Sequence, residues 1–579
     1  GVGSYTVTLV QPLDHAPGNG SNGENSLSLT FGYTATDSDG DTVTGSFVVD
    51  VVDDVAKIGS PFAGGVVEEE QLEVAGLGNE DTSGTGDADS FGGFLGLQFR
   101  DRTTHETGGT LAISWGSDNK NDGDGQPGDR SVQFGPDALT ILSGLNLTSD
   151  GDTLKYTTVT TASGQQILLA YTGSLVPTVL PSSADAAITA NVVFSVALSD
   201  SSAGSYAFKL YDTLDHQGSV QGEDSQVLTF QFTATDSDGD VTAPSTFSVS
   251  VIDDKPFAVG TIGDRYVEEE ELSGGNEDAQ PVGSELAGAI ANGGPVTDKA
   301  GASLNISWGG DDGNKTVNGG FSGTQVAGDR SVVFATGNGS EQTLSAEQVA
   351  QFLTVSGGAG PVAIGLLTSE GQSLVFTLSA DGDVLTAHAG SGTGAVVFTV
   401  SLSDSGNGSY DFDLNGVLDH PVKASGASNE DVLSFNFTFT ARDGDGDVAT
   451  NNFTVKVIDD APVRGEEVRG TAEDEAVNNG NNEGADGLTA VASGDLNIKW
   501  GADDADTVAD LGGKGDRSIA FTNATVSVAD AYNGASLTSL GVPVLTTVLA
   551  NGTLVGYTGS TIPTTINGSN VVFHATLSD

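Results

Sequence analysis

The segment LTFQFTATDSDGDV, residues 228–241, places a strand with alternating large apolar residues directly before a group of aspartates. Leu228, Phe230 and Phe232 alternate with polar residues, and the alternation returns after the aspartates in FSVSV, residues 247–251. Alternation with a period of two is typical of strands that bury one face. The segment therefore predicts two half-buried antiparallel strands joined by an acidic loop.

The acidic loop occurs three times, and each copy is followed one strand later by a pair of aspartates. The loops contain Asp37, Asp39 and Asp41; Asp236, Asp238 and Asp240; and Asp443, Asp445 and Asp447. The pairs are Asp53 and Asp54, Asp253 and Asp254, and Asp459 and Asp460. The triplet Leu-Asp-His, the three tryptophans and the tetrapeptide Gly-Asp-Arg-Ser recur in the same order, with a period of roughly 200 residues. The chain is therefore a tandem repeat.

The register of these markers divides the chain into units. Residues 57–257 and 258–461 are predicted to be complete units, residues 1–56 the C-terminal part of one, and residues 462–579 the N-terminal part of another. Because both ends interrupt a unit, we expect the chain to be a segment of a longer array.

The strands are separated by Gly, Asn, Asp and Ser turns, and helix signals are few. The clearest helix signal is at Ser345 and Gln348, which are spaced for a capping box that opens a short segment reaching Leu353. We therefore predict an all-β fold, namely a tandem array of Ig-like antiparallel β-sandwich repeats with calcium-binding loops.

The composition limits the classes of partner. With 79 acidic and 20 basic residues, the net charge of −59 excludes nucleic acid and anionic membranes as natural partners, because both would repel the chain. The sequence contains no cysteine, so it has no disulfide or thiolate site. Hydrophobic residues make up 37% of the chain, which is enough for packed cores, and no apolar run is long enough to insert into a membrane. Without a recognisable catalytic motif, the chain is not predicted to be an enzyme.

The spacing of the loop aspartates favours calcium. Three carboxylates at alternate positions can converge on one point, where two of them about 4 Å apart repel by about 1 kcal/mol in water and about 4 kcal/mol at an effective dielectric of 20. Calcium accepts six to eight oxygen ligands in flexible geometry, whereas zinc prefers His or Cys. The loop is not an EF-hand, because Val48 or Phe247 stands where a bidentate Glu would be required. We therefore assign the fifteen aspartates of the loops and pairs as candidate Ca²⁺ ligands, with a solvated polar turn as the alternative.

Other acidic residues share the register of the repeat. A second candidate cation site follows each tryptophan, in loops of differing length: Asp118, Asp122 and Asp124; Asp311 and Asp312; and Asp503, Asp504 and Asp506. The aspartates of the Leu-Asp-His triplets are also candidate ligands: Asp14, Asp215 and Asp419. The glutamate runs at residues 68–70 and 268–271 are typical of an exposed strand edge protected from aggregation, with a role in a site as the alternative.

Three further residue types recur at fixed places. We expect the histidines to pack in turns without a catalytic role: His15, His216 and His420. We expect the arginines to pair with neighbouring carboxylates: Arg130, Arg330 and Arg517. We expect the tryptophans to be core anchors in preference to sugar platforms: Trp115, Trp308 and Trp500.

Together these motifs resemble the tandem repeats of giant bacterial RTX-type adhesins exported by type I secretion. The resemblance rests on Leu-Asp-His, on TATDSDGD at residues 34–41 and 233–240, on Val-Ile-Asp-Asp at residues 251–254 and 457–460, and on Ile-Ser-Trp-Gly with Gly-Asp-Arg-Ser. It implies extracellular β-sandwich extenders, rigidified by Ca²⁺, that hold a distal binding domain away from the bacterial cell surface in cell adhesion and biofilm formation. The third copy departs from the pattern, since glycine replaces serine at position 444.

Two other functions remain open on the residues alone. The units could bind a surface glycan or a protein through the variable loops that follow the tryptophans. The chain could also form an extracellular filament by strand complementation, with neighbouring repeats of the same chain or filament as its partners.

Overall fold

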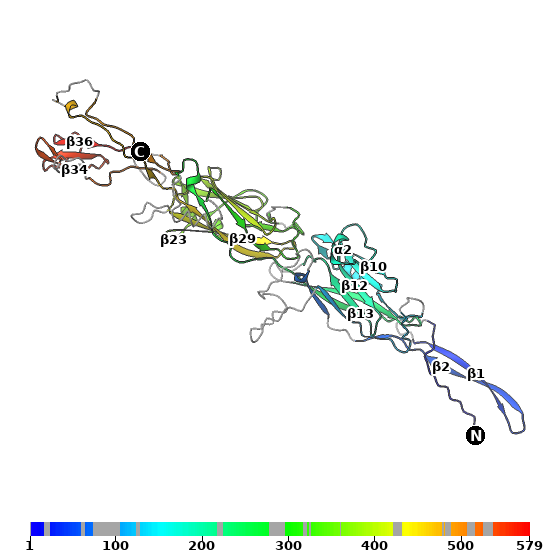
Figure 1. Cartoon of the computed structure of the whole chain (residues 1–579). Coiled ribbons are helices and arrows are strands. Elements are labelled where there is room, and N and C mark those ends of the chain that lie inside the picture. Colours follow the sequence, from blue (N-terminus) through cyan, green and yellow to red (C-terminus); the bar gives the residue numbers. More distant parts are fainter. Residues whose placement is uncertain are drawn as a thin grey trace.

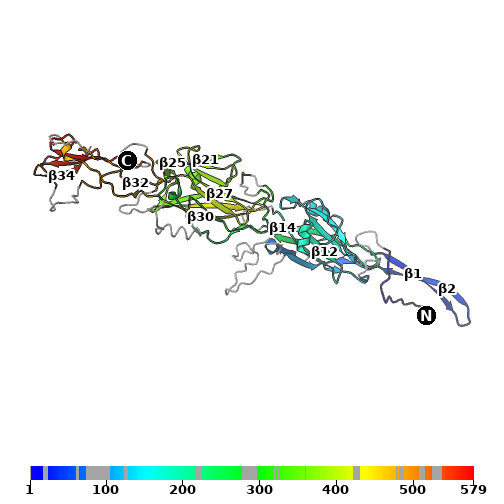
Figure 2. The ribbon, with the colours of Figure 1, turned by 45° about the horizontal axis from the view of Figure 1, so that its top comes forward.

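The computed structural model is almost entirely β, with 5% helix and 42% strand, which confirms the predicted all-β sandwich class, whereas calcium binding by the loops stays a prediction. The structure describes residues 2–16, 24–59, 64–72, 105–122, 128–216, 224–276, 296–316, 321–323, 326–358, 360–420, 431–477, 480, 488–506, 516–524 and 537–579. Two β-sandwiches follow one another in an elongated row, with a hairpin at the N-terminal end and a small sheet at the opposite end (Figures 1 and 2).

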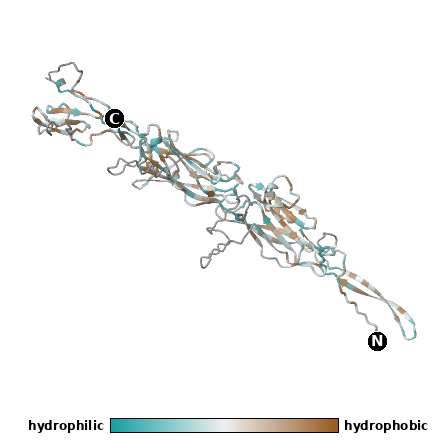
Figure 3. Ribbon diagram, viewed as in Figure 1, coloured by the Kyte–Doolittle hydropathy of each residue, from teal (hydrophilic) through white to brown (hydrophobic). Residues whose placement is uncertain are grey.

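The N-terminal hairpin pairs two long antiparallel strands, β1 (Ser26–Thr36) and β2 (Thr42–Val52), in register from Ser26 opposite Val52 to Thr36 opposite Thr42. The first aspartate loop is therefore the tip of this hairpin. Hydrophobic residues lie along both strands (Figure 3), and the ring of Tyr5 stacks on Phe47 with 3.9 Å between the ring centroids.

The first sandwich has two main sheets. One has the order β4 (Gly65–Glu68), β15 (Ser245–Ile252), β14 (Ser225–Thr235) and β7 (Ser131–Phe134). The other has the order β10 (Lys155–Thr160), β11 (Gln166–Tyr171), β12 (Val192–Ser199), β13 (Ser205–Leu210) and β5 (Glu106–Thr110). Smaller elements are β3 (Lys57–Ile58) paired with β6 (Ile113–Ser114), β8 (Thr148–Ser149) paired with β9 (Asp152–Thr153), the helices α1 (Ala138–Ser143) and α2 (Ala184–Thr189), and the 3₁₀ turn η1 (Glu69–Gln71).

The second sandwich repeats this plan. One sheet has the order β17 (Arg265–Glu268), β30 (Val448–Ile458), β29 (Val432–Arg442), β22 (Leu353–Gly357) and β23 (Gly360–Val362), and β20 (Ser331–Val333) also pairs with β29. The other has the order β18 (Lys299–Ser303), β28 (Ser409–Leu414), β27 (Val396–Ser403), β26 (Val384–Ala389), β25 (Gln372–Leu378) and β21 (Gln342–Leu344), and β24 (Thr368–Ser369) also pairs with β25. Smaller elements are β16 (Phe257–Ala258) paired with β19 (Ile306–Ser307), the helix α4 (Ala346–Val349), and the 3₁₀ turns η2 (Glu269–Glu271) and η3 (Ile364–Leu366).

The C-terminal region has less regular structure among its described residues. It contains β31 (Val463–Arg464) paired with β32 (Ile498–Lys499), the 3₁₀ turn η4 (Asp474–Ala476), and a sheet in the order β33 (Thr538–Ser539), β34 (Val542–Val548), β35 (Leu554–Thr558) and β36 (Val571–Ala575).

Each sandwich buries the apolar faces of its two sheets against each other. In the first, Phe194 of β12 meets Phe230 of β14 across the core, with ring centroids 6.2 Å apart. In the second, Phe398 of β27 meets Phe435 of β29 at 5.3 Å. Buried and partly exposed residues alternate along β14 and β29, as the sequence pattern predicts.

One pair of strands in each sandwich departs from the antiparallel pattern. Strand β4 runs parallel to β15, with Glu68 opposite Ile252, and β17 runs parallel to β30. Because the two strands of a parallel pair end at the same edge, the residues that follow them, Glu69 and Asp253, lie close together. Sequence alternation does not distinguish parallel from antiparallel pairing, so this proximity was not predicted.

The predicted capping box is present, although the helix is short. Ser345 accepts a hydrogen bond from the Gln348 main-chain N–H at 3.3 Å, and Gln348 accepts one from the Ser345 N–H at 2.9 Å. Helix α4 ends at Val349, and Leu353 already begins β22, so the helical segment does not reach Leu353 as expected. A strand follows because Leu353 pairs with Phe437 of β29.

Candidate metal centres

The aspartate loops share a tight turn that their own side chains hold. In the third loop, Asp443 Oδ1 accepts hydrogen bonds from the N–H groups of Gly446, at 2.9 Å, and Asp447, at 2.8 Å. Gly446 has a φ of +126°, in the region that favours glycine, which explains the glycine at the fourth position. The turn thus uses Oδ1 of its first carboxylate.

The second sandwich turns its aspartate loop toward the first sandwich. Around this contact lie seven ionisable residues, which we name the central junction cluster: Glu69, His216 and Asp253 from the first sandwich, and Asp311, Asp443, Asp445 and Asp447 from the second. All are buried apart from Asp445, which is half-buried. The aspartate loop is thus grouped with the aspartate pair of the preceding sandwich, and not with the pair that follows it in its own sequence copy.

Main-chain donors fix several members of this cluster. The His216 N–H donates to Asp445 Oδ2 at 3.0 Å across the junction, and the Leu214 N–H donates to Glu69 Oε1 at 2.8 Å. Glycine at position 444 donates its N–H to the carbonyl oxygen of Asp311 at 2.9 Å. These bonds hold the carboxylates close together although their charges repel.

The electrostatics of the cluster reflect both burial and mutual repulsion. Burial raises the pKa of Asp253 to about 12, with repulsion from Asp445 and Glu69 adding to the effect. Burial also raises the pKa of Asp311 well above its ordinary value, and Glu69 and Asp445 again contribute. Burial raises the pKa of Asp447 to about 7, with Asp445 as the next cause. Residues on both sides of the junction therefore destabilise each other's ionised forms.

Several carboxylate oxygens of this cluster are buried without a donor among the described residues. They are Glu69 Oε2, both side-chain oxygens of Asp311, Asp445 Oδ1 and Asp447 Oδ2. A buried polar atom without a partner is costly, and a buried charge more so. A divalent cation that accepts oxygen ligands would satisfy these atoms, so the donor set fits calcium.

A similar cluster joins the N-terminal hairpin to the first sandwich. This N-terminal junction cluster contains His15, Asp53, Asp118, Asp236, Asp238 and Asp240. His15 donates its N–H to Asp238 Oδ2 at 3.1 Å, and its Nδ1 lies 3.3 Å from Asp53 Oδ1. Burial raises the pKa of Asp236 to about 7 and that of Asp53 to about 6.

A third cluster lies between the second sandwich and the C-terminal region. This C-terminal junction cluster contains Glu269, His420, Asp431, Asp459 and Asp503. Leu418 donates its N–H to Glu269 Oε1 at 2.7 Å, and burial together with Glu269 raises the pKa of Asp503 to about 8. Burial lowers the pKa of His420, whereas in the central junction cluster Glu69 and Asp445 outweigh burial and raise the pKa of His216.

The first aspartate loop lies in a different environment from the other two. Asp37, Asp39 and Asp41 are close enough to share an ion, but all three are exposed at the tip of the hairpin. Their assignment as ligands stays a prediction.

The second aspartate of each pair interacts with the turn after the tryptophan. Asp54 accepts the Ser117 N–H at 2.8 Å, Asp254 accepts the N–H of the glycine at position 310 at 2.6 Å, and Asp460 accepts the Ala502 N–H at 2.6 Å. The glycine just after each tryptophan has a positive φ, and a Cβ there would meet the carboxylate at 2.4–2.7 Å. These three aspartates therefore have a structural partner, and their assignment as ligands stays a prediction.

The Leu-Asp-His aspartates also hold turns. Asp215 accepts the Gly151 N–H at 2.8 Å, and Asp419 accepts the Gly371 N–H at 2.9 Å. The Gly151 turn reaches the second sandwich, where Lys315 Nζ donates to the carbonyl oxygen of Asp150 at 2.6 Å. The junction therefore includes a direct contact between the sandwiches in addition to the acidic cluster.

Two expectations about other repeated residues were wrong or incomplete. The glutamate runs are not exposed strand edges: Glu69 and Glu269 are fully buried, because the parallel strands before them lead into the junctions. The repeated histidines were expected to pack in turns, but His216 and His420 each lie beside a buried glutamate, with 3.5 and 3.4 Å respectively from Nε2 to the glutamate Oε1.

The arginines and tryptophans form a second repeated arrangement. Trp115 and Trp308 are buried in the two cores, as predicted. Each repeated arginine lies over the tryptophan of its unit, with 4.7 Å from the Arg330 guanidinium to the Trp308 ring centroid. Arg330 also donates to main-chain oxygens, including that of Asp404 at 3.1 Å, and its ion pair with Asp312 is longer, at 3.8 Å. The main-chain oxygen is thus closer to Arg330 than the carboxylate of Asp312 is. Arg517 also has the carboxylate partner that we expected, with its Nη2 3.3 Å from Asp506 Oδ2.

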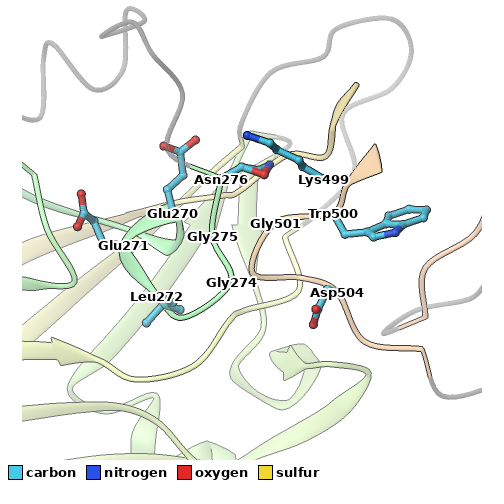
Figure 4. Close-up of a pocket in the computed structure, with 10 residues that line it drawn as sticks. All are labelled: Glu270, Glu271, Leu272, Gly274, Gly275, Asn276, Lys499, Trp500, Gly501 and Asp504. Atoms are coloured by element: carbon cyan, nitrogen blue, oxygen red, sulfur yellow. The ribbon is translucent and has the colours of Figure 1, made fainter. Parts of the chain in front are cut away.

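The tryptophan of the C-terminal region is less buried and lines an open pocket. Glu270, Glu271 and Asn276 lie on the side of the second sandwich, and Trp500 and Asp504 on the C-terminal side (Figure 4). The predicted role as a core anchor therefore holds for two of the three tryptophans. Asp124, a further candidate, lies outside the described residues.

Comparisons with known proteins assign no function to the chain. Residues 302–456 match a family model described as "Domain of unknown function (DUF5801)", which spans most of the second sandwich but well under half of the chain. No curated protein matches the sequence.

Three solved structures align with much of the chain at low similarity. The cadherin-like domains 1 to 4 of zebrafish RET align at 10% identity and a TM-score of 0.17, covering 75% of this chain and 58% of that one. The extracellular cadherin domains 3–6 of protocadherin gamma B2 align at 11% identity and a TM-score of 0.16, covering 78% and 61%. The human desmocollin-1 ectodomain aligns at 10% identity and a TM-score of 0.14, covering 77% and 71%. This chain thus spans less than two thirds of the first two, and TM-scores this low carry no argument about function.

Within the described ranges, no helix has the length and apolar character needed to cross a membrane.

Three residues of the central junction cluster were not among the fifteen aspartates assigned as Ca²⁺ ligands from the sequence: Glu69, His216 and Asp311. Their signal was present in the repeat, since Glu269, His420 and Asp503 occupy the same positions in the next unit. What the repeat does not reveal is that residues more than 200 positions apart, such as His216 and Asp445, meet at one junction.

Proposed function

We propose that this chain is a calcium-rigidified segment of the extracellular stalk of a bacterial surface adhesin, acting in cell adhesion and biofilm formation. The observation that carries the proposal is the central junction cluster, in which carboxylates of two successive sandwiches surround one buried region. The bacterial and extracellular parts of the proposal rest on the resemblance of the repeat motifs to RTX-type adhesins.

Calcium would act here as a link between sandwiches. Asp311, Asp445 and Asp447 of the second sandwich and Glu69 of the first offer oxygen atoms that have no donor within the described ranges. An ion bound by ligands from both sides would remove their repulsion and oppose bending at the junction. When bound, Ca²⁺ supplies positive charge and six to eight coordination positions.

A concentration difference would couple this stiffening to export. Sites of extracellular modules bind Ca²⁺ with dissociation constants of roughly 10⁻⁴ to 10⁻³ M, so they stay empty at the low free calcium of a cytosol. Outside the cell, a free concentration ten times the dissociation constant would stabilise each site by roughly 1.4 kcal/mol. The chain would thus be flexible during export and rigid afterwards.

The test measures motion at the central junction in the full chain of 579 residues. Since the chain has no cysteine, the substitutions Ser163→Cys and Ser340→Cys place one dye on an exposed position of each sandwich. Single-molecule energy transfer is then recorded in calcium, in magnesium and in excess chelator. We expect a narrow distance distribution in calcium alone, and a broad one in chelator or magnesium.

A matched pair of variants locates the effect. Asp311→Asn should broaden the distribution in calcium, because it weakens the central junction. Asp118→Asn changes the corresponding residue of the N-terminal junction cluster and should leave the central distribution narrow. A distribution that does not respond to calcium, or that responds equally to both variants, would contradict the proposal.

A further inference from the structure

The histidines of the junctions have an environment that calcium chemistry does not explain. His216 is 7% exposed, and its Nε2 makes no hydrogen bond to any described residue, although Glu69 Oε1 lies 3.5 Å away. His420 repeats this arrangement, with Nε2 at 3.4 Å from Glu269 Oε1 and with no hydrogen bond from either ring nitrogen to the described part of the chain. These distances exceed the 2.7–3.2 Å that is normal for an N–H···O hydrogen bond.

Each of these histidines and its glutamate form a group of three with an aspartate, namely Asp253 just after β15 and Asp459 just after β30. In Glu69, His216 and Asp253, one ligand atom from each residue lies within 4.8 Å of the others, and the same holds for Glu269, His420 and Asp459. The glutamate is oriented by a main-chain N–H on its Oε1, from Leu214 in the first group. Its Oε2 is buried without a donor among the described residues.

This combination of ligands suits a different class of ion from the aspartate loop. Calcium and magnesium take oxygen ligands, whereas imidazole nitrogen is a common ligand of zinc and other first-row transition metals. Two ligands about 2.1 Å from a tetrahedral zinc ion are about 3.4 Å apart. The observed separations of 3.5 and 3.4 Å between Nε2 and the glutamate oxygen match this spacing.

Another buried histidine of this chain shows what a satisfied core imidazole looks like here. His388 lies in β26, its Nε2 is 3.2 Å from Thr377 Oγ1, and its Nδ1 is 3.1 Å from the carbonyl oxygen of Gly394. Both ring nitrogens therefore have a hydrogen-bond partner, and neither partner is a carboxylate. The junction histidines differ in both respects.

We propose that Glu69, His216 and Asp253 form a site for a divalent transition-metal ion such as Zn²⁺, and that Glu269, His420 and Asp459 form a second. This site adjoins the oxygen ligands of the aspartate loop at the central junction and shares the Glu69 carboxylate with them, with Oε1 beside His216 and Oε2 available to calcium. The N-terminal junction cluster offers a weaker version, because His15 Nε2 lies 3.2 Å from the carbonyl oxygen of Val51 and is already engaged.

The test uses Co²⁺ as a spectroscopic substitute for zinc, added to the metal-free full chain in excess Ca²⁺. Excess calcium fills oxygen-only sites, so visible absorption then reports sites with nitrogen ligands. Zn²⁺ should displace the cobalt and abolish the band. We expect saturation at two tight equivalents, with at least a tenfold weaker third.

Variants identify the ligands. His216→Gln and His420→Gln should each remove one tight equivalent, and the double variant should remove both, whereas the control His388→Gln should leave the titration unchanged. Proton NMR of the cobalt form of the unaltered chain provides a second measurement that does not depend on how the variants fold. Coordinated imidazoles give strongly shifted, exchangeable N–H signals.

Absence of a cobalt band in calcium, absence of shifted imidazole signals, or an unchanged band in the double variant would each overturn the proposal. Failure of the stalk proposal would look different, because calcium would then leave the junction distances unchanged while the cobalt band persisted.

Discussion

Replacement of Asp445 by asparagine should have opposite effects on stability with and without calcium. Asp445 lies at the electrostatic centre of the central junction cluster, since it contributes to the raised pKa of Asp253, Asp311, Asp443 and Asp447. Asparagine keeps the shape and the oxygen that accepts the His216 N–H, but it removes the charge. The substitution therefore isolates the electrostatic part of the interaction.

The magnitude follows from the repulsion that is removed. One carboxylate neighbour at about 4 Å costs about 1 kcal/mol in water and about 4 kcal/mol at a dielectric of 20. Asp445 is half-buried, and neighbours with raised pKa values relieve part of the repulsion by binding protons. We therefore expect Asp445→Asn to stabilise the metal-free chain by about 1 kcal/mol near neutral pH. In calcium the same change removes a charged ligand, and we expect at least a tenfold weaker affinity, which corresponds to about 1.4 kcal/mol.

The assay is scanning calorimetry of the full chain in excess chelator and in saturating calcium, with calcium titration by isothermal calorimetry. Asp39→Asn is the matched control, because Asp39 holds the equivalent position in the exposed loop at the hairpin tip. It should shift stability by less than about 0.5 kcal/mol in either condition. If Asp445→Asn lowered the melting temperature in chelator, or if both variants behaved alike, the reasoning about buried repulsion would be refuted.

Two further predictions concern the direct contact between sandwiches and the pH dependence. Gly328→Ala should weaken the contact between the sandwiches, because a Cβ there would lie 2.2 Å from the Asp150 carbonyl oxygen. The distance distribution measured by energy transfer across the central junction should therefore broaden. Gly128→Ala is its control, since Gly128 also has a positive φ and no atom of a described residue lies within 4 Å of a Cβ built there. Equal effects of the two variants would contradict the contact. In chelator, the melting temperature should fall as pH rises from about 4 to about 7. At low pH, Asp447 is protonated in both the folded and the unfolded chain. As the pH rises, it ionises in the unfolded chain but stays protonated in the folded chain, where its pKa is about 7. The unfolded state is therefore increasingly favoured. Calorimetry in 0.5 M salt, which screens exposed charges, checks this, and a melting temperature independent of pH would refute it.

The β-sandwich architecture was predictable because its information is local. Each signal spans only a few residues: the alternation in β14 and β29, the glycine in each aspartate loop, and the capping residue Ser345. A short stretch of sequence is therefore enough to predict the strand, the turn or the helix start. The repeated markers added the period, and with it the expectation that acidic residues return in equivalent places.

The grouping of the acidic residues was less predictable. In the sequence each aspartate loop is followed by its own pair, and nothing there indicates which loop meets which pair. In the structure Asp445 lies near Asp253, in the pair of the preceding unit. The parallel pairing of β4 with β15 then carries Glu69 to the same place, and no local pattern encodes that pairing. For this reason the glutamate runs were misread as exposed edges.

The all-β fold, the repeat and the acidic chemistry could be inferred before the structure was known, because strand alternation and composition follow directly from the order of residues. Three features became visible only once the chain was folded: which carboxylates meet, that the second aspartates of the pairs hold the tryptophan turns, and that histidine lies beside glutamate at the central and C-terminal junctions. The physical reason is that these contacts join residues far apart in the chain, and the sheet register and the packing of one unit on the next bring them together.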